Sequence, residues 1–260
     1  MNPYIDLGWF RLPTYPLAAV AGIICCLLLF AFSGIRFGIT TKELCKSASE
    51  AYPWGFIGAV TLGLLTKLPH FIEQDISFPQ MLINSGIVFY GGLLGVVFGL
   101  WLYTLRTTMD LSVYLDAFAP LIPIFHAFGR IGCYLGGCCY GRLYDGIGCV
   151  AYPVDGVAAN RFPVQLVEAA ACLILGCVLL ALVGKVKKGN LICVYFVCYA
   201  LIRFADEFLR GDAIRGIWFG LSSSQWISIA ILGVIGVRTL QKHGLIWGRY
   251  VKDVKHRYNR

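Results

Sequence analysis

The residues best suited to chemistry are ionisable side chains inside or beside apolar segments. The clearest group is Tyr199, Arg203, Asp206, Glu207 and Arg210, which recur at spacings of three and four residues. At about 100° per helical residue, they share an arc of about 100° on one helix face. A charge at the centre of a bilayer costs roughly 2.5–3.5 kcal/mol on insertion scales. This face is therefore expected to line a cavity inside the protein or to lie near the membrane interface, and ionisable residues in such a place are functional by default. The alternative is an ion-paired helix end with an ordinary i,i+4 pair.

A second group centres on Arg130, which Gly129 and Gly132 flank and Cys133 follows. Glycine lets two backbones approach closely. The guanidinium fork matches two phosphate oxygens, so a buried arginine in this setting indicates phosphate binding. The alternative is a helix-packing seam lined by glycine.

Two further motifs are weaker on their own. Pro163 fits the first turn of a helix, and Gln165 and Glu168 follow it on one face of an apolar segment. They could support the arginine site or form an interhelical hydrogen bond, which contributes about 0.6 kcal/mol in membranes. The glycine-rich segment at 89–95 is typical of close helix packing.

Four of the 11 cysteines lie close together in sequence, at Cys133, Cys138, Cys139 and Cys149. They could bind zinc, form a disulfide or serve as small packing residues. The spacing of the first three is not a standard zinc pattern, and the segment contains no histidine. A disulfide is the more plausible special role, and passive packing remains an equal alternative.

The elements that position these residues are apolar helices. Hydrophobic residues make up 58% of the 260-residue chain and charged residues 14%, against about 45–50% and 25% in soluble domains. Seven segments approach the length that crosses about 30 Å of hydrocarbon. The predicted fold is therefore all-α, a polytopic membrane bundle of about seven transmembrane helices in one domain over residues 1–260. The predicted spans are Tyr15–Gly34, Tyr52–Phe71, Met81–Leu105, Leu115–Leu135, Pro163–Val183, Leu191–Leu209 and Gln225–Leu240.

Two features qualify these spans. The first apolar run, Tyr15–Phe32, is too long for a typical signal-peptide core, which predicts a retained span. The fourth span is interrupted by Pro120, Pro123, His126 and Arg130.

The charges orient this bundle. The net charge of the chain is +8. Fourteen of the 22 Lys and Arg residues lie either in three alternate loops or in the C-terminal part of the chain, which comprises Arg238 and the basic tail at 241–260. Positive loops face the cytoplasm, so the pattern predicts N-out and C-in and removes the need for a nucleic-acid partner. Five arginines break the rule on the outward side and need another explanation: Arg130, Arg142, Arg161, Arg203 and Arg210.

Taken in order, the motifs resemble those of the prolipoprotein diacylglyceryl transferases of bacterial inner membranes. The resemblance covers most of the chain from Tyr90 to Gln225. It rests on four segments that match the family's signatures: Tyr90-Gly-Gly-Leu93, Gly129-Arg-Ile-Gly-Cys133, Val164-Gln-Leu-Val-Glu168 and Tyr199 through Arg210.

The resemblance implies transfer of the diacylglyceryl group of phosphatidylglycerol to the lipobox cysteine of a preprolipoprotein. A thioether forms, glycerol phosphate leaves, and no metal or organic cofactor is needed. It implies a multi-pass protein of the bacterial inner membrane, in contact with membrane lipids, with its active site towards the outer leaflet. Arg130, Arg203 and Glu207 match catalytic residues, and Tyr90 stands at the position of the family's histidine. The substrate-binding residues would be Tyr15, Gly91, Gly92, Gly129, Cys133, Gly141, Gln165, Glu168, Tyr199 and Arg210.

The sequence departs from the family pattern near this site. Tyr90 replaces a histidine, Cys133 an asparagine and Cys138 a glutamate, and a glycine–arginine segment of the second span is absent. The group that takes the proton of the acceptor cysteine is therefore open, between Tyr90, with an ordinary tyrosine pKa of about 10, and the substrate phosphate. Two other functions remain as alternatives: a non-catalytic phospholipid-binding or transport protein, and a redox or metal protein based on the cysteines.

Overall fold

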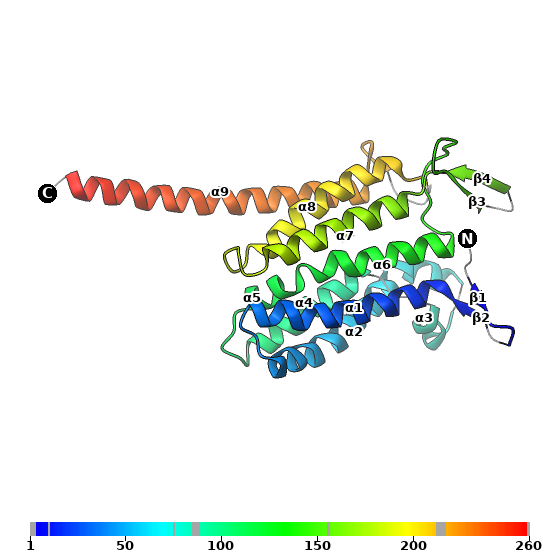
Figure 1. Cartoon of the computed structure of the whole chain (residues 1–260), viewed down its shortest axis with the longest axis horizontal. Helices are drawn as coiled ribbons and strands as arrows, with labels where there is room; N and C mark the ends of the chain where they lie inside the picture. Colours follow the sequence, from blue (N-terminus) through cyan, green and yellow to red (C-terminus); the bar gives the residue numbers. More distant parts are fainter. Residues whose placement is uncertain are drawn as a thin grey trace. The chain divides into compact units, whose positions relative to one another are not determined.

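The computed structural model describes residues 4–9, 11–74, 76–84, 89–154, 157–211 and 217–258. Helices dominate this part of the chain (Figure 1). The helices are α1 (Thr14–Arg36), α2 (Thr41–Glu73), α3 (Phe78–Asn84), α4 (Phe89–Thr104), α5 (Leu111–Phe118), α6 (Leu121–Gly136), α7 (Val164–Leu182), α8 (Leu191–Asp206), the 3-10 helix η1 (Glu207–Leu209) and α9 (Ser223–Tyr258). The strands form three antiparallel hairpins: β1 (Tyr4–Asp6) with β2 (Arg11–Pro13), β3 (Val150–Val154) with β4 (Val157–Arg161), and β5 (Ile217–Trp218) with β6 (Leu221–Ser222).

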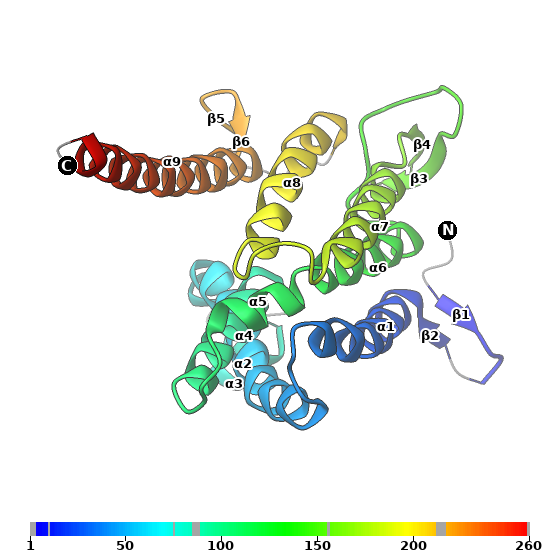
Figure 2. The ribbon, with the colours of Figure 1, turned by 60° about the vertical axis from the view of Figure 1, so that its left-hand side comes forward.

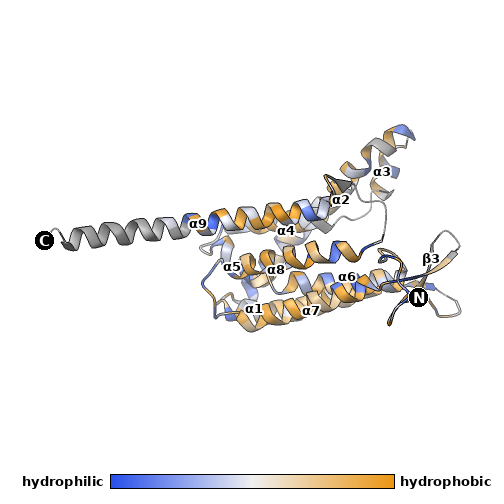
Figure 3. Ribbon diagram, turned by 90° about the horizontal axis from the view of Figure 1, so that it is seen from above, coloured by the Kyte–Doolittle hydropathy of each residue, from blue (hydrophilic) through white to orange (hydrophobic). Residues whose placement is uncertain are grey.

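The helices confirm the predicted class, an all-α polytopic membrane protein. Among the described residues, four helical stretches are long and apolar enough to cross a membrane: Thr14–Arg36, Leu111–Gly136, Val164–Leu182 and Ser223–Gln241. Gly91–Thr104 is a shorter apolar helix. Apolar residues cover most of α1 and α7 (Figure 3). The count of seven spans, the N-out/C-in orientation and the division into one membrane domain with a basic tail at 241–260 stay predictions.

The predicted fourth span is divided where the sequence places its prolines. α5 ends at Phe118, and α6 begins at Leu121 directly after Pro120. Proline has no backbone N–H to donate, and it disfavours helical geometry in the residue before it. The break leaves α6 as a separate helix that carries His126 and Arg130.

The chain forms two compact units. The first contains residues 1–26, 119–181 and 190–260 and holds α6, α7, α8 and α9. In this unit α6 and α7 lie side by side (Figures 1 and 2), with Gly176 of α7 against the side chain of Ile124. Gly22 of α1 lies against Phe128 of α6 in the same way. Small residues thus let α6 pack closely against both neighbours.

The second unit contains residues 27–118 and 182–189. Its α2 and α4 pack so closely that a Cβ atom on Gly91 would meet the backbone of Gly58, and one on Gly95 the carbonyl of Trp54. Glycine-mediated contact of this kind is common between membrane helices. The glycines that follow Tyr90 therefore have a packing role.

Side-chain caps begin two of the long helices. Thr40 and Glu43 form a capping box before α2, with the Thr40 hydroxyl donating to Glu43 Oε2 at 2.7 Å. The hydroxyl and the backbone N–H of Thr40 lower the pKa of the Glu43 carboxyl. Ser222 and Gln225 cap α9 in the same manner, with the backbone N–H of Ser222 donating to Gln225 Oε1 at 3.0 Å. This second cap positions the first turn of α9, which reaches the site described next.

Candidate functional site

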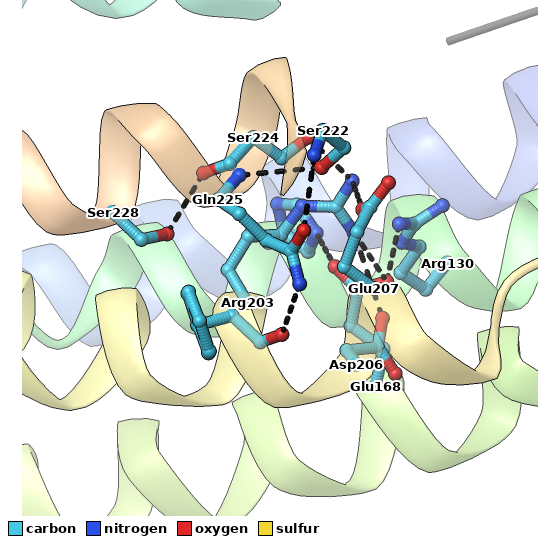
Figure 4. A network of polar contacts seen from close by, with 11 residues as sticks. Arg130, Glu168, Arg203, Asp206, Glu207, Ser222, Ser224, Gln225 and Ser228 are labelled. Carbon is cyan, nitrogen blue, oxygen red and sulfur yellow. Dashed lines mark hydrogen bonds and ion pairs between the residues drawn. The ribbon is translucent and has the colours of Figure 1, made fainter. Parts of the chain in front are cut away.

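A buried carboxylate on α7 lies at the centre of a charged network in the first unit (Figure 4). Glu168 is 1% exposed. Arg130 of α6 forms an ion pair with Glu168 Oε2, and Nη1 of Arg203 on α8 lies 3.7 Å from the same oxygen. Three helices therefore place three predicted site residues together.

Arg203 has further partners on its own and the next helix. Its Nη2 lies 2.9 Å from Glu207 Oε2, and its Nη1 lies 3.5 Å from Asp206 Oδ2. Nη2 also donates to the hydroxyl of Ser224 at 3.1 Å. The predicted pairing of Glu207 with Arg203 is present, although α8 ends at Asp206 and Glu207 begins η1. Asp206 and Ser224 are additions to the predicted site.

His126 is a site residue that sequence reasoning missed. Its Nε2 lies 3.0 Å from Glu168 Oε1, and its ring meets Tyr199 edge to face at a centroid distance of 5.4 Å. His126 precedes Arg130 by four residues, so both lie on the same face of α6. This spacing of four residues could have identified His126 from the sequence. His126 and Arg130 together engage both oxygens of Glu168.

The arginines retain hydrogen-bonding capacity. Nε of Arg130 is buried and has no hydrogen-bond partner in the described structure, and the buried Nη1 of Arg203 has only its two longer ion-pair contacts with Glu168 and Asp206. A buried donor without an acceptor costs about 1–3 kcal/mol and calls for an explanation, such as a bound ligand, an ordered water or a catalytic role. Guanidinium donors on two converging helices suit the oxygens of a phosphate group.

A loop beyond α6 runs beside this network. Arg142 N donates to the carbonyl of Leu209 at 2.9 Å, and Gly211 N donates to the carbonyl of Tyr140 at 3.2 Å. Gly141 pairs with Arg210 between these two bonds. A Cβ on Gly141 would meet the carbonyl oxygen of Phe162, so only glycine fits this position. Gly141 and Arg210 thus act through their backbones to join the loop to the end of η1.

Gln165 holds the same loop from α7. Its Nε2 donates to the carbonyl of Cys138 at 2.7 Å, and its Oε1 accepts from the hydroxyl of Tyr152 at 3.0 Å. Burial raises the pKa of Tyr152, which keeps its hydroxyl protonated as the donor. The predicted supporting role of Gln165 therefore takes the form of a contact with the loop.

The structure also accounts for Arg161, one of the five outward arginines. Its guanidinium lies over the ring of Tyr140 at 4.2 Å and donates to the carbonyl of Gly141 at 3.3 Å. Arg142, in contrast, is exposed.

The other predicted residues divide between the two units. Tyr15 of α1 is half-exposed and lies against Gly132 of α6. Gly129 lies on α6 beside Arg130, with open space around it. Tyr90, Gly91 and Gly92 lie on α4 in the second unit, and the side chain of Tyr90 is outside the described residues. Their part in the site stays a prediction.

Cys133 belongs to a cluster of free thiols at the end of α6. The Sγ atoms of Cys133, Cys138 and Cys139 all lie within 4.8 Å of one another. Among the described residues, all eleven cysteines are free. The pKa of Cys139 is lowered by hydrogen bonds from Cys133 and Cys138, with Arg130 and Arg210 adding positive potential.

Fold and site together define a multi-pass helical membrane protein with a buried arginine–carboxylate centre suited to an anionic ligand. Residues 3–240 match the family described as prolipoprotein diacylglyceryl transferase, and the chain belongs to that family. The family and the transferase class predicted from the motifs are thereby confirmed.

Individual relatives carry this activity in their names. Phosphatidylglycerol–prolipoprotein diacylglyceryl transferase 2 of Clostridium perfringens is 32% identical over 231 residues, which cover 87% of this chain and 90% of the relative. The transferase of Clostridium tetani is 28% identical over 244 residues, covering 91% and 96%. That of Idiomarina loihiensis is 32% identical over 249 residues, covering 89% and 87%.

Proposed function

We propose that this chain transfers the diacylglyceryl group of phosphatidylglycerol to the lipobox cysteine of a preprolipoprotein. A thioether forms and glycerol phosphate leaves. The observation that carries this proposal is the convergence of Arg130 and Arg203 on Glu168, with a buried Nε of Arg130 that has no hydrogen-bond partner in the described structure. Family membership supplies the reaction, and the arginine pair supplies a place for the phosphate.

In this mechanism the arginines bind the lipid phosphate and stabilise the charge that grows as the carbon–oxygen bond breaks. Donors fixed in advance around a developing oxyanion are worth about 10²–10³ in rate each. Glu168 and Glu207 hold the two guanidinium groups in place, so little reorganisation is needed during the reaction. His126 of α6 contacts Glu168, and Tyr199 of α8 packs against the His126 ring.

The charge pattern of the sequence supports a place for the reaction. The basic loops and tail support an orientation with the C-terminus on the cytoplasmic side of the membrane, which would be the inner membrane of a bacterium. The arginine-bearing ends of the predicted spans then lie towards the outer leaflet, where a lipid and the signal-peptide lipobox can meet. Nucleic acid has no part in this function.

The test is transfer of radiolabelled diacylglycerol from phosphatidylglycerol to a lipobox peptide by the purified chain. Arg130→Ala and Arg203→Ala should abolish transfer while the protein remains folded and inserted. Arg106→Ala is the matched control, because Arg106 is exposed and pairs only with Glu50 among the described residues. Transfer at the wild-type rate by both site variants would refute the proposal.

A further inference from the structure

We propose that Cys133, Cys138 and Cys139 bind a zinc ion whose fourth position accepts the thiol of the lipobox cysteine. This inference rests on the proposed function and deepens it, since it supplies the group that activates the acceptor. It departs from the cofactor-free reaction that the family resemblance implies. It is carried by the geometry of the three sulfurs and by the contacts that hold them.

The three sulfurs are close enough to share one ion. Their Sγ atoms lie within 4.8 Å of one another. A zinc–thiolate bond of about 2.3 Å in a tetrahedral site places two sulfurs about 3.8 Å apart. The separations of the three sulfurs therefore exceed the spacing of a zinc site by about 1 Å at most.

The backbone brings the cysteines together at the end of α6. Gly137 adopts a left-handed conformation with φ 74°, and its N–H donates to the carbonyl of Tyr134. Cys139 is also left-handed, with φ 57°, which is uncommon for a residue other than glycine. The chain turns back at these two residues and directs Cys138 and Cys139 towards Cys133.

A contact from α7 holds this turn in place. Gln165 Nε2 donates to the carbonyl of Cys138 at 2.7 Å, and Tyr152 in turn donates to Gln165. Partners one contact removed from the metal typically orient its ligands. The predicted site residue Gln165 thus gains a specific purpose.

The donor set favours zinc in a reactive site. In the part of the chain that the structure describes, the group of potential ligands contains these three cysteines and no fourth. Catalytic zinc sites keep three protein ligands and one open position, and thiolates prefer zinc or monovalent copper. Three thiolates and Zn²⁺ carry a net charge of −1. Arg130, three residues before Cys133 on α6 and paired with Glu168, adds positive potential at the cluster.

Zinc would generate the nucleophile that the reaction needs. When the acceptor sulfur binds zinc, its S–H bond breaks and the proton passes to water. The sulfur then forms a bond to the glyceryl carbon of the lipid as the carbon–oxygen bond breaks. The electron pair leaves with the phosphate oxygen, beside Arg130 and Arg203. The neutral thioether is a poor zinc ligand and departs. No separate base, such as Tyr90, is required.

The binding experiment uses the full chain in lipid nanodiscs, stripped with a chelator and dialysed against zinc. We expect one zinc per chain by elemental analysis. Cys133→Asn, which installs the family residue, and Cys139→Ser should lose it, while Cys149→Ser, in the same loop outside the cluster, should keep it. Cobalt in place of zinc should show thiolate charge-transfer absorption. A lipobox peptide should shift this spectrum, and the same peptide with serine for cysteine should not.

The transfer experiment separates the two proposals. Stripping zinc should lower transfer by about 100-fold or more, and zinc should restore it, while binding of phosphatidylglycerol persists and reports folding. Wild-type transfer by zinc-free Cys133→Asn would overturn the zinc site and leave the transferase function standing. Equal zinc in wild type and Cys139→Ser, or uptake of monovalent copper with exclusion of zinc, would also overturn it. Zinc and peptide binding without any transfer would instead refute the proposed function.

Discussion

Arg130 of α6 and Arg203 of α8 form ion pairs with one and the same atom, Oε2 of Glu168 on α7. The shared oxygen joins three helices through charges that are almost entirely buried. Breaking one member of a buried ion pair leaves an uncompensated charge, which costs more than the pair itself contributes. A change to any one of these three residues should therefore affect the other two.

The geometry of the guanidinium groups should matter beyond their charge. Arg130→Lys keeps a positive charge near Glu168 but loses the fork that binds two phosphate oxygens. We expect transfer to fall by about 100-fold, with thermal stability closer to wild type than for Arg130→Ala. Radiolabel transfer and thermal unfolding in the same membrane mimetic check this. Equal activity of Arg130→Lys and wild type would show that only charge is needed.

Glu168 should be needed for stability as well as activity. Glu168→Leu leaves two buried guanidinium groups without their shared carboxylate, at a cost of roughly 3–5 kcal/mol. The amide of Glu168→Gln can still accept a hydrogen bond, so this variant should unfold at a higher temperature than Glu168→Leu. Thermal unfolding followed by the accessibility of buried Cys172 would measure the difference. Identical unfolding of both variants and wild type would contradict the central role of this carboxylate.

His126 should act through Glu168. His126→Leu leaves Glu168 Oε1 without the partner seen at 3.0 Å, and an unsatisfied buried acceptor costs about 1–3 kcal/mol. His126→Gln can restore a donor to that oxygen and should recover most of the stability and transfer. Comparison of the two variants by unfolding and by radiolabel transfer tests this. If His126→Gln were as damaged as His126→Leu, the imidazole itself would have a role that hydrogen bonding does not explain.

Much of the site was predictable because helical periodicity is local. Arg203, Glu207 and Tyr199 share a face at spacings of four residues, and that face is buried in the structure. The proline break before α6 was equally visible. The position of Glu168 at the centre was not predictable, because it depends on how α7 is rotated against α6 and α8. Sequence periodicity does not contain that rotation.

Contacts between backbone atoms could not be predicted either, because sequence periodicity does not show how a loop packs against a helix. Gly141 and Arg210 were predicted to bind substrate, which stays a prediction, and the structure adds a pairing of their backbones that the sequence did not reveal. The spacing of the cysteines matches no standard metal motif, so the sequence did not predict their cluster. Their sulfurs lie close together in the structure, where Cys139 adopts a left-handed backbone conformation. His126 was predictable in principle, because it lies one turn before Arg130.

Gln165 should control zinc affinity through the cysteine turn. Gln165→Leu removes the donor to the Cys138 carbonyl. Loss of a hydrogen bond that orients a metal ligand typically lowers metal affinity by about 10–100-fold. Tyr152→Phe removes only the hydrogen bond to Gln165 and should cost less. Competition with a zinc-binding dye gives the affinities. Unchanged zinc affinity in Gln165→Leu would show that the turn holds its shape without α7.

Gly141 should tolerate no side chain. A Cβ at this position would meet the carbonyl oxygens of Phe162 and Leu209, which are backbone atoms and cannot move aside cheaply. Gly141→Ala should therefore destabilise the chain by about 1–3 kcal/mol and lower transfer, because the loop beside Arg210 is displaced. Gly233→Ala is the matched control, since Gly233 lies within α9 with open space around it. Alanine there should stabilise the helix by up to about 1 kcal/mol. Parallel unfolding and transfer measurements on the two variants decide the matter, and a harmless Gly141→Ala would mean that the loop is not held against η1 in the membrane.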